Sequence, residues 1–437
     1  MVSLTNHPFF YRAAAFVFMG AGLIGAQGGE STTPVKRIAM ALADFDVEME
    51  AILAAHRDDI KKHRTTWITV RAAPGAGVSV RQTRHAFEFG TAISRHAFTS
   101  SKRIGKADRE QYKKVLKANF NSVVHENAMK WSSNEKDRDS LTYADADAML
   151  AWSEKNGLST RGHCVYWAYD KHVQPWLKEL DNAALRAKLQ QRARLHMQRF
   201  QGRVTEHDIN NEMLHGQYYE KRLGAGIREQ MFDWCHAYDP RAILYVNDYN
   251  ILAGDDTGRY ATQINGFLKA GMKVGGIGIQ GHFHEHVEAT CIKSKLDLLA
   301  QFGLPIKITE YDANTADPQA KARMLVTLYA TAFAHPAVEA IYMWGFWKKL
   351  HWRPQSALWQ ADWSTTLAAR YYRELVFKRW WTDFDGQADA RGNCRIRVFF
   401  GGHDVTVNGR TRHFKVGKAA VNTIIDCTAA EPGEWKY

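Results

Sequence analysis

The chain of 437 residues contains only five cysteines, too few for a dense disulfide framework. Their spacing does not match a zinc site either. Cys164 lies in a predicted strand and Cys235 in a predicted helix, so we expect both to be buried thiols. Cys394 and Cys427 flank a C-terminal segment and could pair in an oxidising compartment. At least one cysteine stays unpaired.

Long apolar runs are missing after the first 28 residues, so no later segment reaches the length needed to span a membrane. At the start of the chain, Arg12 precedes an apolar run over 13–26, and small residues follow at Ala26, Gly28 and Gly29. This order of charge, apolar core and small residues is typical of a secretory signal; a buried helix is the alternative. We expect residues 1–28 to be a signal peptide and the mature protein to be secreted or periplasmic, with no membrane partner.

A concentrated basic segment is also missing, although the net charge is +12. The densest basic stretch, residues 182–200, alternates its cations with an apolar stripe, which is typical of a helix with one solvated face. We therefore expect no nucleic-acid partner, while an acidic polysaccharide remains compatible with the charge. The fourteen tryptophans are numerous, and Trp rings either fill cores or stack on sugar rings.

Residues 86–382 alternate eight short apolar runs with helical patterns, and this alternation predicts an α/β protein with a (β/α)8 TIM barrel. A doubly wound sheet is the structural alternative, but it would not need eight runs that each end in polar or aromatic residues. The runs cover residues 87–92, 122–125, 162–167, 204–210, 243–247, 276–280, 306–309 and 341–344.

Two smaller segments flank the predicted barrel. Residues 29–85 contain a helical pattern followed by two β-like runs around the turn Pro74-Gly75-Ala76-Gly77, which predicts an N-terminal hairpin. Residues 383–437 predict a β-rich appendage with Asn408-Gly409 as one of its turns. The appendage either packs with the hairpin, which is the simpler interpretation, or binds carbohydrate.

Two glutamates each close a predicted buried strand: Glu212 ends the run 204–212 and Glu310 ends the run 306–310. A carboxyl beside apolar strand residues costs free energy unless it has partners or a task. The C-terminal strand ends of a barrel converge on one face, where active sites lie. The two glutamates therefore predict a paired-carboxylate site that breaks a glycosidic bond.

Polar and aromatic side chains gather at the other strand ends as well, and together they predict one shared pocket. They are His125, Glu126, Asn127, Lys130, His163, Trp167, Asn211, Asn247, Asp248, Gln280, His282, Asp312 and Trp344.

The strand ends lie in short motifs that follow one another along the chain. They are Glu126-Asn-Ala-Met-Lys-Trp131, Gly162-His-Cys-Val-Tyr-Trp167, Asn210-Asn-Glu212, Leu244-Tyr-Val-Asn-Asp-Tyr-Asn250, Ile277-Gly-Ile-Gln-Gly-His282, Ile308-Thr-Glu-Tyr-Asp312, and Trp344-Gly-Phe346 with Trp352-Arg353. Their order resembles glycoside hydrolase family 10, the retaining endo-β-1,4-xylanases, over about residues 87–352. The flanking segments look like those of a plant-like and bacterial branch of that family.

The resemblance implies hydrolysis of internal bonds in xylan, with Glu310 as the nucleophile and Glu212 as the general acid and then the general base. Retaining chemistry requires the two carboxyls to lie about 5–5.5 Å apart. Glu310 must stay ionised, and His282 is its expected donor. Burial and the charge of Glu310 should raise the pKa of Glu212.

The remaining site residues are expected to bind sugar or to support those that do. Asn211 should bind the 2-hydroxyl in the cleavage subsite, and Trp344 and Trp352 should stack against the sugar. The other predicted substrate-binding residues are Glu126, Asn127, Lys130, His163, Trp167, Gln280 and His282; Asn247 and Asp312 are predicted to support them.

Several positions depart from the family pattern. Ala168 and Asp170 stand where the family usually has His and Gln, and Trp347-Lys348-Lys349 replaces a common Asp-Lys pair. We expect Trp347 to narrow the cleft. A related β-glycan hydrolase with altered sugar specificity is therefore an alternative.

Two further alternatives belong to other classes. His282-Phe-His-Glu-His286 could bind a metal with help from His163, His207 or Asp312, as in metal-dependent barrel hydrolases. A non-catalytic sugar-binding barrel is the other, although both glutamates are present. We expect a monomer with no cofactor and no metal.

Overall fold

The computed structural model describes residues 34–419 and 422–428. The predicted signal peptide, residues 1–28, lies outside the described residues. The chain divides after Asp46 into two compact units, and the second, from Val47 onward, contains every element discussed below except the first part of α1 (Pro34–Arg64). None of the helices in the described ranges is long and apolar enough to cross a membrane.

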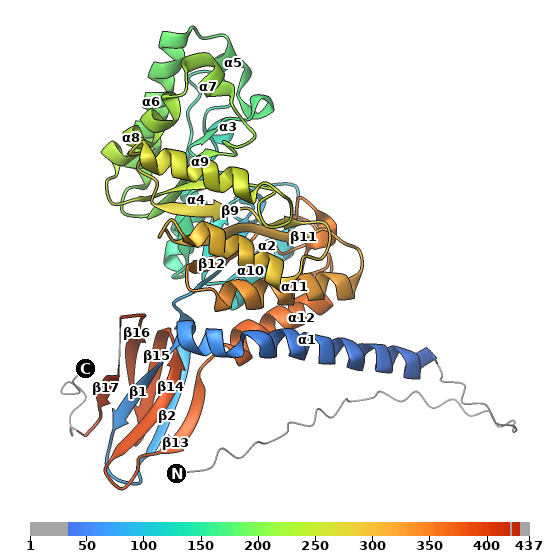
Figure 1. The fold of residues 1–437 in the computed structure, drawn as a ribbon, viewed down its shortest axis with the longest axis vertical. Coiled ribbons are helices and arrows are strands. Elements are labelled where there is room, and N and C mark those ends of the chain that lie inside the picture. Colours follow the sequence, from blue (N-terminus) through green and yellow to red (C-terminus); the bar gives the residue numbers. More distant parts are fainter. Residues whose placement is uncertain (1–33, 420–421, 429–437) are drawn as a thin grey trace, which may run out of the picture. The chain divides into compact units, whose positions relative to one another are not determined.

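Eight strand positions form a closed parallel barrel, as predicted. Figure 1 labels β9, β11 and β12 among its strands. The last strand pairs with the first and closes the barrel. In chain order the positions are β3 (Glu88–Ile93), β4 (Ser122–His125), β5 (Ser159–Arg161) with β6 (Tyr166–Trp167), β7 (Glu206–Asn211), β8 (Ile243–Asp248), β9 (Gly276–Ile279), β11 (Ile306–Ala313) and β12 (Val338–Met343).

The third barrel position differs from the predicted run over 162–167, because it consists of two short strands. β5 pairs with β4, β6 pairs with β7, and a single bridge from Gly162 to His207 joins the two parts. The interruption falls at His163, whose side chain lines the pocket described below. A short strand, β10 (His282–Phe283), also pairs in parallel with the end of β11, opposite Asp312 and Ala313.

Helices follow the strands along the chain. Side-chain caps fix the start of three of them. Asp181 accepts a hydrogen bond from the backbone N–H of Ala184 in α6, Asp317 accepts from those of Gln319 and Ala320 in α11, and Thr366 accepts from that of Ala369 in α12. The main helices are α2 (Lys106–Asn119), α4 (Ala144–Lys155), α6 (Asn182–Phe200), α8 (Ile227–Tyr238), α9 (Thr257–Lys269), α10 (Ala289–Ala300), α11 (Pro318–Ala334) and α12 (Leu367–Glu374), with shorter ones at α3 (Trp131–Asn134), α5 (Pro175–Lys178) and α7 (Tyr218–Leu223).

Helix α6 has the predicted apolar stripe, but one of its cations is not solvated. Arg192 is buried, and its guanidinium donates hydrogen bonds to the backbone carbonyls of Met129 and Val165 and to the side chain of Asn134. Arg192 therefore ties the loops after β4 and β5 together, because a buried guanidinium requires several acceptors.

The segments on either side of the barrel form one two-sheet β-sandwich. One sheet orders β14 (Asn393–Phe399), β1 (Thr65–Arg71) and β17 (Thr423–Asp426); the other orders β13 (Asp383–Gln387), β2 (Gly77–His85), β15 (Gly401–Val407) and β16 (Arg410–Val416). The C-terminal appendage therefore packs with the N-terminal strands, and β15 and β16 form a hairpin around Asn408-Gly409.

The predicted N-terminal hairpin is wrong. In the described part of the chain β1 pairs with β14 and β17, whereas β2 pairs with β13 and β15. Each strand has one apolar face, and Ile68 and Val70 of β1 share a core with Val78 and Val80 of β2. Two apolar faces bury each other when the strands lie in opposite sheets, and this burial outweighs the local turn signal.

The proposed pairing of Cys394 with Cys427 is also wrong. All five cysteines are free. Cys394 on β14 lies opposite Val70, while Cys427 follows β17 on the other side of β1. A strand between them separates the residues by about 9–10 Å, beyond the reach of a disulfide. Cys164 and Cys235 are buried, as predicted.

Candidate active site

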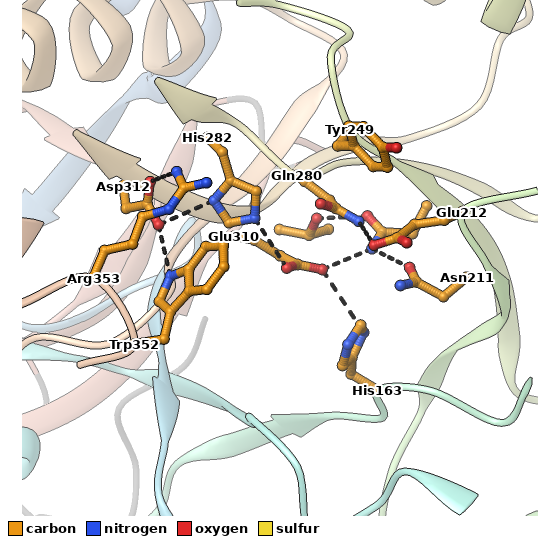
Figure 2. A network of polar contacts seen from close by, with 12 residues as sticks. His163, Asn211, Glu212, Tyr249, Gln280, His282, Glu310, Asp312, Trp352 and Arg353 are labelled. Carbon is orange, nitrogen blue, oxygen red and sulfur yellow. Dashed lines mark hydrogen bonds and ion pairs between the residues drawn. The ribbon is translucent and has the colours of Figure 1, made fainter. Parts of the chain in front are cut away.

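A cavity of about 700 Å³ lies at the C-terminal ends of the barrel strands, and Glu212 and Glu310 both line it. Figure 2 shows the two carboxyls directed into the same space. Every predicted substrate-binding residue lines this cavity too: Glu126, Asn127, Lys130, His163, Trp167, Asn211, Gln280, His282, Trp344 and Trp352.

Glu310, on β11, is buried and surrounded by donors. Asn247 donates its amide N–H to Oε1 at 2.9 Å, and Nε2 of His282 lies 3.4 Å from Oε2. Nδ1 of His163 lies 3.9 Å from Oε1. Burial alone would raise the pKa of Glu310, but the charge of His163 and the hydrogen bond and charge of His282 outweigh it and lower the pKa. Glu310 is thus held as a carboxylate.

His282 is positioned by a second carboxylate. Its Nδ1 lies 3.1 Å from Oδ2 of Asp312, which also accepts a hydrogen bond from Nε1 of Trp352 at 2.8 Å. Arg353 donates to the other oxygen of Asp312 at 3.0 Å. Burial opposes protonation of His282, but Asp312 and Glu310 together raise its pKa to about 9. The imidazolium therefore persists at neutral pH. Figure 2 shows the His282 ring in contact with Glu310 on one side and Asp312 on the other.

Glu212 has the opposite electrostatic setting. It follows β7 with a left-handed backbone (φ 61°), uncommon for a residue other than glycine. Nε1 of Trp167 donates to Oε2 at 2.7 Å, and Nε2 of Gln280 donates to Oε1 at 2.9 Å. Burial, with a contribution from the charge of Glu310, raises the pKa of Glu212 despite these two hydrogen bonds. Glu212 therefore holds its proton to higher pH than Glu310.

Asn247 connects the two sides of the site, behind the cavity. Its amide donates to Oδ1 of Asn211 and to Glu310, both at 2.9 Å. Thr309 donates its hydroxyl to the Asn247 carbonyl oxygen at 2.6 Å, which fixes the orientation of the amide. Asn247 contacts Glu310, and Asp312 contacts His282; neither residue is among those that line the cavity.

Lys130 lies over two aromatic rings of the cavity, 4.7 Å from the centre of Trp167 and 5.9 Å from that of Trp344. It also donates to Oδ1 of Asn127 at 3.1 Å. Burial raises the pKa of Glu126, with Lys130 acting against it. These contacts combine aromatic faces with donors, a lining suited to a hydroxylated ring.

Sequence reasoning missed several residues that line the cavity. Three of them, Tyr249, Asn250 and Arg353, lie in motifs that carry the family resemblance, so the sequence did contain a signal for them. Residues 169–172 lie where the sequence departs from the family pattern, and no motif pointed to them. The missed lining residues are Tyr169, Lys171, His172, Tyr249, Asn250, Ala253, His284, Glu285 and Arg353.

The departures from the family pattern do not fill the cavity as expected. Trp347 is buried and stacks on Trp363 with ring centres 4.2 Å apart, so the prediction that it narrows the cleft is wrong. Burying the large apolar ring of Trp347 in the core removes more of its surface from water than a position on the cleft wall would, and this burial is favourable. Asp170 points to Lys178, 2.9 Å from its Nζ, and Ala168 is buried.

The residues proposed for a metal site do not converge. Within residues 34–419 and 422–428, no group of three or more His, Cys, Asp or Glu side chains is arranged to hold a metal ion. His282 is committed to Glu310 and Asp312, whereas His286 faces Glu288 and His207 lies against His196. The donor set therefore does not fit a metal-dependent hydrolase.

A closed parallel barrel with two buried glutamates of opposite pKa shift at its C-terminal face defines the class of glycoside hydrolases that act through a carboxylate pair. Residues 80–376 match the model of glycosyl hydrolase family 10, and the chain belongs to this family.

Two relatives illustrate the sequence similarity. The chain is 37% identical over 326 residues to anti-sigma-I factor RsgI6 of Acetivibrio thermocellus, covering 74% of this chain and 41% of that protein. It is 35% identical over 363 residues to endo-1,4-beta-xylanase 2 of Arabidopsis thaliana, covering 80% of this chain and 33% of that protein. The chain thus spans well under half the length of these relatives.

Solved structures agree with the fold. Xylanase 10B from Thermotoga petrophila RKU-1, in complex with xylobiose, superposes with a TM-score of 0.62 at 25% identity, covering 67% of this chain and 95% of that chain. Native xylanase 10B from Thermotoga maritima gives the same TM-score and identity, with 67% and 96% covered.

Proposed function

We propose that this chain is a retaining endo-β-1,4-xylanase that cleaves internal bonds of xylan through a covalent glycosyl-enzyme intermediate. The observation that carries the proposal is the pair Glu212 and Glu310, which share one cavity and have pKa values displaced in opposite directions. Such displaced values suit one group to donate a proton and the other to attack as a carboxylate.

In the first step, Glu310 attacks the anomeric carbon while Glu212 protonates the departing glycosidic oxygen. In the second step, Glu212 removes a proton from water, which attacks the same carbon and releases Glu310. The hydrogen bonds from Asn247 and His282 hold the carboxylate of Glu310. Gln280 and Trp167 hold Glu212 on the leaving-group side. We expect about 5–5.5 Å between the two carboxyls.

The assignment of xylan as the substrate is supported by family membership and by relatives that are named endo-1,4-beta-xylanases. A structural neighbour was solved with xylobiose. Asn211 would bind the 2-hydroxyl of the sugar in the cleavage subsite, and Trp344 and Trp352 would form the walls of that subsite by stacking. Tyr169, Lys171 and His172 also line the cavity, beside positions where the sequence departs from the family pattern, so the sugar preference is tested directly below.

The proposal is tested by incubating the protein with plain xylan, glucuronoxylan, mixed-linkage glucan and cellulose and measuring the reducing ends released. We expect short xylo-oligosaccharides from both xylans, and NMR of the first product should show the β-anomer. Glu310→Ala should lose at least 10⁴-fold in kcat, as do enzymes that lack their nucleophile. An unchanged rate, or an α-anomeric first product, would refute the mechanism; cleavage of the glucans alone would favour a related β-glycan hydrolase.

We also propose that residues 1–28 direct export and that the mature enzyme is a monomer. The support for export is the residue order at the start of the chain, where Arg12 precedes the apolar run. Fractionation of expressing cells, with mass spectrometry of the N-terminus, tests the export; light scattering tests the oligomeric state. An uncleaved protein retained in the cytoplasm would contradict the first proposal, and a dimer mass the second.

A further inference from the structure

The turn that carries Glu212 is held at several backbone positions. The backbone N–H of Glu212 donates to the carbonyl of Asn247 at 2.9 Å, and the N–H groups of His215 and Gly216 both donate to the carbonyl of Glu212. Gly216 packs so closely on the backbone of Ala168 and Tyr169 that an added Cβ would lie 2.6 Å from the nearest atom. Because Glu212 has a left-handed backbone, this turn needs such restraints to stay in place.

A buried carboxylate supplies the main restraint on the side of β8. Asp248, the last residue of β8, accepts a hydrogen bond from the backbone N–H of Leu214 at 2.7 Å and from that of Tyr249 at 2.9 Å. Its Oδ1 also lies 2.7 Å from Nδ1 of His215. The side chain of Asp248 is only 1% exposed, so these contacts replace its hydration.

The other nitrogen of the His215 ring faces a second carboxylate. Nε2 lies 3.3 Å from Oδ2 of Asp256, which also accepts a hydrogen bond from the side chain of Asn250 at 2.6 Å. A neutral imidazole has a single N–H, so only the imidazolium donates from both nitrogens to the two carboxylates. The hydrogen bond to Asp248 and the charges of both aspartates raise the pKa of His215 against the effect of burial.

Two arginines on neighbouring helices have partners of their own. Arg259 of α9 donates to Oδ1 of Asp256 at 2.5 Å. Arg228 of α8 donates to the backbone carbonyl of Met213 at 2.8 Å and pairs with Glu220 of α7 at 2.6 Å. The ring of His215 stacks on Tyr249, with centres 3.9 Å apart and planes 15° apart.

We propose that His215 is a positioning residue for the general acid: as a cation held between Asp248 and Asp256, it fixes the turn that places the Glu212 carboxyl on the leaving-group oxygen. His215 itself contacts neither carboxyl of the catalytic pair in this role; it acts through the turn over residues 212–216. The inference rests on the proposed function, because it assigns His215 to the proton-transfer part of that reaction.

Two substrates separate this role from general support of the fold. A xylo-oligosaccharide needs the proton from Glu212, whereas a 2,4-dinitrophenyl β-xylobioside releases an anion that leaves without it. His215→Asn keeps a donor near Asp248 but loses the contact with Asp256. At pH 6 we expect this variant to lower kcat/KM for the oligosaccharide about tenfold or more, which corresponds to the loss of one hydrogen bond to a charged group. We expect kcat/KM for the xylobioside to change less than twofold. An equal loss on both substrates, or no loss on either, would overturn the proposal.

The charge of His215 can be measured by NMR, independently of any activity assay. In ¹⁵N NMR of the histidine side chains, the resonances missing from His215→Asn identify His215, and we expect both of its nitrogens to be protonated at pH 6. Asp256→Asn removes one carboxylate and should lower the pKa of His215. The matched control is Asp404→Asn, which breaks the exposed pair of Asp404 with His413 (3.0 Å) in the β-sandwich and should leave both substrates unchanged. A neutral His215 at pH 6 would overturn the proposal.

The tests also distinguish the two ideas from each other. If the unaltered protein hydrolyses neither substrate, the proposed function fails. If it hydrolyses both but His215→Asn shows no difference between them, only the positioning role fails. Denaturation midpoints of all variants, compared with the parent, establish that activity is compared between folded proteins.

Discussion

The hydrogen bond from Trp167 to Glu212 should set part of the pKa of the acid, and removing it offers a direct measurement. Nε1 of Trp167 donates to Oε2 at 2.7 Å, and this bond works against the burial that raises the pKa of Glu212. Trp167→Phe keeps an aromatic ring to stack on His172, whose ring centre lies 3.6 Å away, and removes only the donor. The ionised form of Glu212 then loses stabilisation, so its pKa should rise further.

The magnitude follows from the strength of such a bond. A hydrogen bond to a charged group contributes about 1.5–3 kcal/mol, and one pKa unit corresponds to about 1.4 kcal/mol. Trp167 is half-buried, so water can replace part of the lost bond. We therefore expect the pKa of Glu212 to rise by about one unit.

The assay is ¹³C NMR of protein labelled at the glutamate carboxyls, titrated with pH, with Glu212→Gln identifying the resonance. Trp363→Phe is the matched control, because Nε1 of Trp363 also donates to a carboxylate, Asp108 at 3.0 Å, but does not line the cavity. The control should leave the pKa of Glu212 in place. A pKa of Glu212 that is unchanged or lower in Trp167→Phe would refute the electrostatic account of the acid.

Three further outcomes concern stability, measured by denaturant unfolding. Lys307→Met should lower the free energy of unfolding by about 3–5 kcal/mol, because the ammonium lies 2.6 Å from Glu88 and 2.5 Å from Glu206 and its loss leaves the buried carboxylate of Glu206 without this cation. Adding Glu206→Gln should restore part of the lost free energy, and no recovery would contradict the pairing. Arg192→Leu should cost about 3 kcal/mol, since three buried acceptors lose their donor, and a cost below about 1 kcal/mol would show that water replaces it. His282 has a pKa of about 9 in the folded protein, above its ordinary 6.5, so its protonation stabilises the fold fully below pH 6.5. This stabilisation, at most about 3 kcal/mol, is lost as the pH rises toward 9. His282→Asn should lack this part of the dependence of the unfolding free energy on pH, and an identical dependence in the variant would contradict the assignment.

Most of the barrel was predictable because strands such as β8, β9 and β12 are local apolar runs. The exception is β5 (Ser159–Arg161), which has no apolar residue and lies outside the predicted run over 162–167. Glu212 and Glu310 were identifiable on the same grounds, since a carboxylate at the end of a buried strand is unusual in any fold. The structure places both at one cavity, together with all the substrate-binding residues proposed from the sequence. The roles of those residues remain predictions.

What could not be predicted depends on partners that are distant in sequence. The two N-terminal strands look like a hairpin locally, but Val70 finds its neighbours in residues 394 and 425, more than 300 positions away. Arg192 has the spacing of a solvated cation, and only the loops after β4 and β5 explain its burial. The support of the Glu212 turn by Asp248 and His215 likewise involves two loops whose proximity the sequence does not reveal.

The β-sandwich also bears on how this protein can be shortened. Each of its sheets combines a strand that precedes the barrel with strands that follow it: β1 lies between β14 and β17, and β2 lies between β13 and β15. Removing residues 383–437 would therefore not detach an independent module; it would strip both neighbours from β1 and from β2 and leave two bare apolar strands prone to intermolecular pairing. Because β2 pairs with β13, the segments that lead into and out of the barrel lie side by side in the sandwich. An additional domain attached to the sandwich would therefore leave the chain of the barrel uninterrupted.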